Sequence, residues 1–214
     1  MATTTTDYPR LAAKIAITAA LLGAVADVLL LYSPRGGYET GDYQFLLDIS
    51  QERIIIGHYM GIFFIPLAML GLFHVYRCIM PAGGALPWAI VLGALFIGYP
   101  GVAYHGMVAF IHTLVHQGGA DAALLDYFRL LSEPVGGVLA LGGGIVAILF
   151  MFVVLKRPTH YAKWMAFANP GVFYLVIALS YLLIPPVGNL LMPAAFNLSF
   201  AIFFACSLVA ERGK

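Results

Sequence analysis

Charged residues are scarce in this sequence. Only 10% of the 214 residues are Asp, Glu, Lys or Arg, against about 25% in a typical soluble domain. The formal net charge is +1, so the chain lacks the basic surface that recognises nucleic acid. Sixty-two per cent of the residues are hydrophobic, far more than a soluble fold of this length could hide from water. The composition therefore excludes a soluble enzyme, a nucleic-acid-binding protein and a disordered chain.

Cysteine is also scarce, since the chain has only Cys78 and Cys206. Each lies near the end of an apolar run, and neither belongs to a CxxC pair. Two separate cysteines form neither a disulfide framework nor a metal-binding motif. We interpret both as small apolar side chains within helices. The sequence also lacks a glycine-rich loop of the kind that follows a strand and binds nucleotide phosphates.

Long hydrophobic runs are abundant. They cover residues 11–32, 54–77, 86–116, 135–155, 162–185 and 189–210. Their lengths suit tilted helices that cross about 30 Å of hydrocarbon, and Gly- and Pro-rich breakers separate them. Because backbone polar groups must be satisfied within lipid, we expect every run to be helical. The sequence predicts an all-α integral membrane protein, a six-transmembrane-helix bundle that forms a single domain over residues 1–214.

Basic residues are distributed unevenly between the two sides of this bundle. If the N-terminus is inside, three lie outside, namely Arg35, Arg53 and Arg129. Eight lie inside, namely Arg10, Lys14, Arg77, Lys156, Arg157, Lys163, Arg212 and Lys214. The positive-inside rule then predicts that both termini are cytoplasmic, with extracytoplasmic loops at 33–53 and 118–134. We expect the protein in the cytoplasmic membrane of a prokaryote.

The first run allows an alternative. Arg10 and Lys14 precede an apolar stretch with the small residues Ala24-Val25-Ala26, which resembles a cleaved signal peptide. The apolar run continues through Leu31, and this favours an uncleaved helix. Cleavage would leave five spans in the same orientation.

Polar residues within the predicted spans are costly and by default indicate function. The predicted topology brings most of them to the outer half of the bundle, where they could form a polar pocket. Asp27 must there be neutralised, or paired with Arg53 or a histidine. A buried pair that only holds helices together is the structural alternative. We assign catalytic roles to Asp27, His58, His105 and Glu133, and substrate binding to Arg53, Tyr104, Tyr181, Asn189 and Asn197.

Histidines of the third run raise the question of a metal. His112 and His116 have the i, i+4 spacing that presents two imidazoles to one ion. With a carboxylate they would suit zinc. His105, seven residues away, lies about 10 Å along the helix and is too far to join the same site. Haem would need pairs of histidines at matching depths, for example His58 with His105 or His112. We favour no metal or cofactor and keep zinc and haem as alternatives.

Small residues suggest how the helices pack. Glycine lets membrane helices approach closely, so we expect close packing at two groups. These are Gly57, Gly61 and Gly71 in the second run, and Gly136, Gly137, Gly142, Gly143 and Gly144 in the fourth.

Three functions remain open at this point. The leading hypothesis is a multi-pass membrane enzyme that acts on a lipid, sterol-like or isoprenoid substrate by acid–base chemistry, as an isomerase, cyclase or hydrolase. A binding or transport protein for a small molecule or a proton would use the same polar groups. A non-catalytic subunit of a membrane complex is the third. The partners we expect are the lipid bilayer and a lipophilic small molecule, without nucleic acid, and a homo-oligomer stays open.

Overall fold

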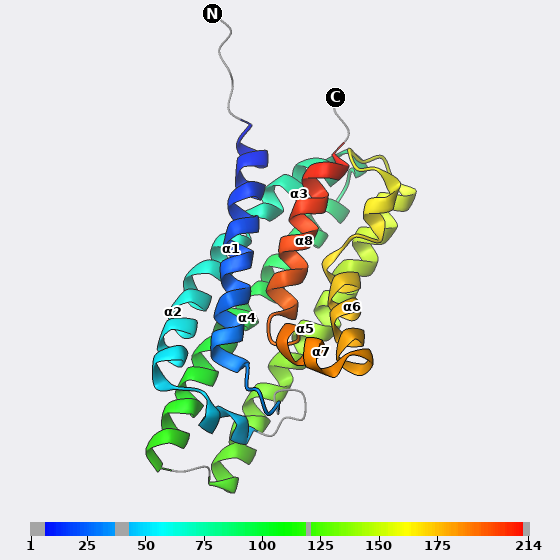
Figure 1. Cartoon of the computed structure of the whole chain (residues 1–214). Helices are drawn as coiled ribbons and strands as arrows, with labels where there is room; N and C mark the ends of the chain where they lie inside the picture. Colours follow the sequence, from blue (N-terminus) through cyan, green and yellow to red (C-terminus); the bar gives the residue numbers. More distant parts are fainter. Residues whose placement is uncertain (1–6, 37–42, 119–120, 212–214) are drawn as a thin grey trace, which may run out of the picture.

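The structure is a computed structural model that describes residues 7–36, 43–118 and 121–211, and in these ranges it is all-helical (Figure 1). The described residues form no β-strand, and Tyr161 and Glu211 make one isolated antiparallel β-bridge. The helices are α1 (Tyr8–Leu31), α2 (Gln51–Ala68), α3 (Gly71–Ile79), α4 (Leu86–Gly118), α5 (Ala122–Lys156), α6 (Pro170–Leu183), α7 (Pro185–Leu191) and α8 (Ala195–Ala210). Short 3-10 helices are η1 (Tyr43–Asp48), η2 (Met80–Ala82) and η3 (Lys163–Ala166).

Several of these helices could cross a membrane. In the described residues four stretches are long and apolar enough: α1, the run Gln51–Ala82 through α2, α3 and η2, α4, and α5. Helices α7 and α8 would make a fifth only if their 81° bend is counted within one span, and α6 has only 14 residues. The protein is therefore an all-α bundle with four to five candidate membrane spans. The six spans predicted from the sequence are not confirmed.

Three predicted boundaries were wrong. Helix α5 begins at Ala122 instead of residue 135, because Asp121 caps it and Pro134 is accommodated inside it. Most of the predicted loop 118–134 is therefore helical. Helix α6 begins at Pro170 instead of 162, since Asn169 accepts a hydrogen bond from the Val172 amide and ends the preceding segment. The last predicted run is divided at residues 192–194, between α7 and α8.

The packing of the bundle is organised around α1, which contacts α2, α3 and α8. Helix α4 packs against α2 and α5, while α6 packs against α7 and α8. One core lies among α1, α3, α5 and α8 and includes Val153, Met165 and Phe204. A second core lies beneath η1 and includes Leu46 and Ile111. Helix α1 begins and α8 ends at the same end of the bundle (Figure 1).

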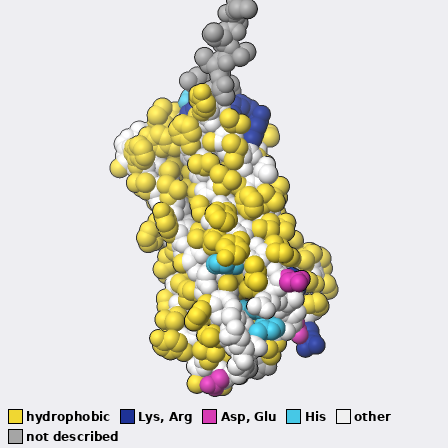
Figure 2. Space-filling view, turned by 90° about the vertical axis from the view of Figure 1, so that its left-hand side faces the viewer, with side chains coloured by type: hydrophobic (Ala, Val, Ile, Leu, Met, Phe, Trp, Pro, Cys, Tyr) yellow, Lys and Arg dark blue, Asp and Glu magenta, His cyan; other side chains and the backbone are white. Residues whose placement is uncertain are grey.

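The outer faces of the helices carry large apolar side chains. Phe63 on α2 is 68% exposed and Leu141 on α5 is 74% exposed. Figure 2 shows apolar side chains over the middle of one face, with Lys and Arg near its two ends. A surface of this kind is stable against lipid hydrocarbon and not against water.

The two groups of glycines behave differently. A Cβ on Gly57 would lie 2.9 Å from the Ala26 carbonyl oxygen of α1, and one on Gly71 would lie 2.6 Å from the Phe204 ring. The predicted close packing of the second run is thus confirmed. In α5 a Cβ would meet nothing within 4 Å at four glycines, and only Gly142 has a neighbour, at 3.2 Å. The prediction was wrong for Gly136, Gly137, Gly143 and Gly144.

We expect Gly57→Ala to lower the stability of the protein by about 1–3 kcal/mol, because the new methyl group collides with the backbone of α1. Gly106→Ala on α4 is the matched control, since its Cβ meets nothing within 4 Å. Thermal unfolding in detergent should show a lower midpoint for the first variant only. Equal midpoints would contradict a tight α1–α2 contact at Gly57.

Candidate functional site

Three polar side chains from distant parts of the chain meet inside the bundle, and we call them the Asp27 triad. His105 Nε2 of α4 lies 2.8 Å from Asp27 Oδ1 of α1. Asn197 Nδ2 of α8 donates to Asp27 Oδ2 at 2.7 Å. Asp27, His105 and Asn197 are 5%, 3% and 1% exposed. The triad therefore ties α1, α4 and α8 together in a space closed to solvent.

The hydrogen bonds of the triad stabilise the buried Asp27 carboxyl group. Both Asp27 oxygens have a partner, and one proton bridges Oδ1 and His105 Nε2 whether the pair is an ion pair or an acid with a neutral imidazole. A buried carboxyl group is stable only with such partners. His105 Nδ1 and Asn197 Oδ1 have none among the described residues. A Cβ on Gly61 would lie 2.2 Å from His105 Nδ1, so α2 closes that side of the ring.

His58 and Arg53 lie beside the triad without joining it. His58 Nδ1–H donates to the His105 carbonyl oxygen at 3.3 Å, from a partly buried position on α2. Arg53 donates to the carbonyl oxygens of Val28, at 3.0 Å, and Tyr32, at 2.8 Å. These carbonyls belong to the last turn of α1, where a cation also matches the helix dipole. The structure therefore uses Arg53 as a cap of α1 and not as the partner of Asp27.

A cavity of about 750 Å³ lies between α4, α5, α6 and α8. Its longest wall is a stripe of α5 at helical spacing, from Ser132 through Gly136, Gly143 and Ala147 to Met151. This stripe is roughly 28 Å long at 1.5 Å per residue. Three of the bare glycines of α5, Gly136, Gly143 and Gly144, line this space, and this explains why a Cβ there would touch nothing. No member of the Asp27 triad lines the cavity.

Most of the cavity wall is apolar, and apart from Asn169, Tyr174 and Ser199 its polar groups gather at one end. Tyr43 of η1 and Ser132 share a hydrogen bond of 3.1 Å, and Glu133 follows Ser132 in the lining. Tyr104, the neighbour of His105 on α4, also lines the cavity. Its level matches that of Glu133, because Ile97 faces Gly142 where the antiparallel helices α4 and α5 cross. We call Tyr43, Tyr104, Ser132 and Glu133 the polar end.

The cavity has two further features that bear on a ligand. Ile148 of α5 and Leu175 of α6 line it and are 67% and 61% exposed. Helices α5 and α6 touch at Ala147 and Gly171, where a Cβ on the glycine would lie 2.7 Å from the Ala147 Cβ. Beside this contact, the exposed side chains of Ile148 and Leu175 leave an opening between the two helices. Ser199 Oγ of α8, a buried atom in the lining, has no hydrogen-bond partner among the described residues.

Two of the predicted substrate-binding residues lie elsewhere. A Cβ on Gly188 would lie 2.0 Å from the Tyr181 Cα, so the backbones of α6 and α7 are in contact at Tyr181. The Asn189 side chain lies against Gly36, 3.2 Å from where a Cβ would be. Neither Tyr181 nor Asn189 lines the cavity or bonds to the triad.

His112 and His116 hold a loop. Their ring centroids are 4.2 Å apart. His112 Nε2–H donates to the Ile49 carbonyl oxygen at 2.8 Å, and His116 Nε2–H donates to that of Leu46 at 3.3 Å. These bonds fix η1, which carries Tyr43 of the polar end. In the described residues no third ligand joins this pair within the range of a metal site.

A different cluster has the composition of a metal site. The ligand atoms of His74, Cys78 and Glu211 all lie within 4.8 Å of one another, and the i, i+4 spacing of His74 and Cys78 is a signal that sequence reasoning missed. Glu211, however, accepts hydrogen bonds from Arg10, at 2.9 Å, and from Arg77. Two cations already neutralise the carboxylate, so the cluster gives weak support for a metal.

The same ion pairs join the ends of the chain. Arg77 of α3 also donates to Asp7, at 2.6 Å, and this bond lowers the pKa of the Asp7 carboxyl group. Tyr161 shares a hydrogen bond with Ser207, and burial raises the pKa of its phenol. The start of α1, the middle of the chain and the end of α8 are thereby held together.

The fold and cavity define an all-helical protein with several apolar helices long enough to cross a membrane. The chain belongs to DUF6796, a family of unknown function, whose profile matches residues 6–211. No curated protein and no solved structure matches it. The functional argument therefore depends on the chemistry of the site.

We expect Asp27→Ala to be strongly destabilising, because it leaves His105 Nε2 and Asn197 Nδ2 buried without partners, at about 1–3 kcal/mol each. Asp27→Asn should cost less, since the amide keeps an acceptor oxygen and Asn197 can rotate to present its unpartnered Oδ1. Thermal unfolding in detergent measures both. Asp126→Ala is the control, because its carboxylate is 75% exposed. Equal losses for the two Asp27 variants would contradict the triad.

Proposed function

We propose that the protein is a multi-pass membrane enzyme that acts on a lipophilic molecule held in the cavity, with Glu133 as the acid–base group. The observation that carries this proposal is a carboxyl group at one end of a long apolar cavity within apolar helices. A carboxyl group beside a bound substrate can donate or accept a proton. The chemistry that fits is an isomerisation, cyclisation or hydrolysis of a lipid or isoprenoid molecule.

The size and walls of the cavity support a lipophilic substrate. A volume of about 750 Å³ lies within the ~300–1,000 Å³ usual for ligand sites. Phe196, Phe200 and Phe203 of α8 form one wall. Each methylene group buried against such walls contributes about 0.8 kcal/mol. The opening between α5 and α6 gives a substrate dissolved in the bilayer a direct path.

Glu133 suits the catalytic role better than Asp27. Both oxygens of Asp27 are engaged, and its side chain does not line the cavity. A catalytic acid or base must come within hydrogen-bonding reach of the substrate. We therefore assign Asp27, His105 and Asn197 a positioning role. They fix α4 against α1 and α8, so that Tyr104, next to His105, faces the cavity.

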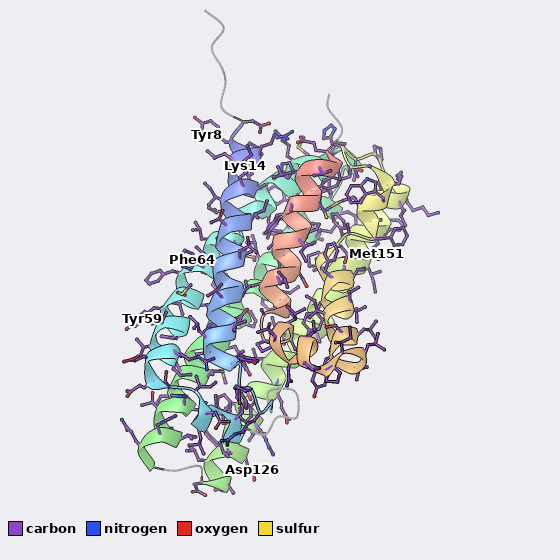
Figure 3. The ribbon with its side chains drawn as sticks, viewed as in Figure 1. Tyr8, Lys14, Tyr59, Phe64, Asp126 and Met151 are labelled. Carbon is purple, nitrogen blue, oxygen red and sulfur yellow. The ribbon has the colours of Figure 1, made fainter. Side chains whose placement is uncertain are left out.

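We also propose the finer topology. Six crossings, with α6 as a short fifth and α8 as the sixth, would return the chain to the side where it starts, and α1 and α8 do begin and end at one end. Lys14 lies near that end and Asp126 near the other (Figure 3). The positive-inside rule then makes the end with the termini cytoplasmic, in the cytoplasmic membrane of a prokaryote.

Cysteine labelling tests this orientation. In a Cys206→Ala background, we expect an impermeant thiol reagent added to intact cells to label Asp126→Cys and to spare Arg157→Cys. Permeabilised cells should label both and so control for accessibility. Labelling of Arg157→Cys alone in intact cells would invert the topology.

A lipid extract tests the function. We expect purified protein, incubated with membrane lipids and followed by untargeted mass spectrometry, to convert a lipophilic component into a new product. Glu133→Gln should form no product while it keeps the part of the binding that the apolar walls provide. Gly144→Leu, which places a side chain into the cavity where a Cβ meets nothing within 4 Å, should lose both.

Gly137→Leu is the matched control, because Gly137 has the same free space and does not line the cavity. If Gly144→Leu abolishes binding but neither the parent protein nor Glu133→Gln ever forms a product, the protein binds or transports its ligand and is not an enzyme. Binding unaffected by Gly144→Leu would contradict the cavity as the site.

A further inference from the structure

The charge of the cavity restricts what its ligand can be. Glu133 is the one charged residue among the described residues that line it, and no Lys or Arg is present in that lining. No ion pair involves Glu133 in the described part of the chain. A ligand with a carboxylate or phosphate head would meet an unneutralised negative charge. The polar end therefore favours a head group that is cationic or donates hydrogen bonds.

The residues around Glu133 favour the cation. Tyr43 and Tyr104 line the same end, and the faces of aromatic rings attract ammonium groups. Tyr43 is held in place by its bond to Ser132 and by edge-on contact with Phe128, at 4.7 Å between ring centroids. The loop that carries Tyr43 is itself fixed by His112 and His116. The head-group site is thus formed before a ligand arrives.

The shape of the cavity favours a single chain. The lining extends along α5 from Ser132 to Met151, roughly 28 Å. Away from the polar end its walls are mainly apolar side chains, with gaps at glycine and with Asn169 and Ser199 as polar members. A rigid fused-ring molecule would fill only part of that length. A linear chain would lie along the glycine gaps with its head at Glu133.

We propose that the ligand is a single-chain amphiphile with a protonated amine as its head group. The amine donates to the Glu133 carboxylate between Tyr43 and Tyr104, and the chain lies along α5. This inference rests on the proposed function only in using the same cavity. In this proposal the Glu133 carboxylate forms an ion pair with the amine of the ligand. The same carboxylate is also the base closest to the head-group end of the ligand.

The experiment compares three probes with one chain length: hexadecylamine, hexadecanol and hexadecanoate. Their dissociation constants are measured by native mass spectrometry in a non-ionic detergent at neutral pH. We expect the amine to bind roughly tenfold more tightly than the alcohol, and hexadecanoate to bind most weakly. Glu133→Gln should lower the affinity for hexadecylamine to that for hexadecanol and leave the affinity for hexadecanol unchanged.

Two controls separate the head group from the cavity. Glu52→Gln removes an exposed acid of α2 that does not line the cavity, and it should leave all three affinities unchanged. Gly144→Leu should weaken all three probes. Equal binding of amine and alcohol, or tightest binding of hexadecanoate, would contradict a cationic head group. Weaker binding by Gly144→Leu in the same experiment would still support the cavity as the binding site. No effect of Gly144→Leu on any probe overturns the cavity and, with it, the proposed function.

Discussion

The hydrogen bonds of Asp27 hold the bundle in register. A carboxyl group in this position cannot be hydrated, so it must find donors on other helices, and it finds one on α4 and one on α8. Both donors are also buried, so each of the three side chains depends on the others. Rotation of α1 by a single residue would break both bonds, and rotation of α4 or α8 would break one and leave two buried polar groups without that partner. The arrangement of α1, α4 and α8 follows from this constraint.

The rest of the site follows from that arrangement. With His105 fixed toward α1, the preceding residue, Tyr104, lies about 100° further round α4 and lines the cavity. The two histidines farther along α4 then lie beneath η1 and hold its carbonyl groups. Packing around α1 is dense, whereas α5 approaches α6 closely at Ala147 and Gly171 but has four glycines with nothing within 4 Å of a Cβ. The bundle thus combines a rigid half with a half that has room for a ligand.

Much of this fold and part of its site could be predicted from sequence. The hydrophobic runs predict the long helices, and the depth of Asp27, His105 and Asn197 predicts that they could meet. The sequence could not show what lies opposite a glycine, so Gly57 and Gly144 looked alike although one meets a backbone and the other an empty space. Arg53 was predicted to bind substrate, with pairing to Asp27 as an alternative, but its guanidinium donates to carbonyl oxygens at the end of α1. The Asn169-Pro170 pair, a typical helix start, was present and overlooked.

The opening between α5 and α6 has a consequence for how the protein samples its surroundings. Ile148 and Leu175 line the cavity and are largely exposed. A molecule that enters there is drawn from the two-dimensional solution of the bilayer and never passes through water. Occupancy then depends on the mole fraction of the ligand among the lipids, and not on its aqueous concentration. For the proposed ligand, diluting the membrane with inert lipid would lower the occupancy of the cavity, while diluting the surrounding buffer would not change it.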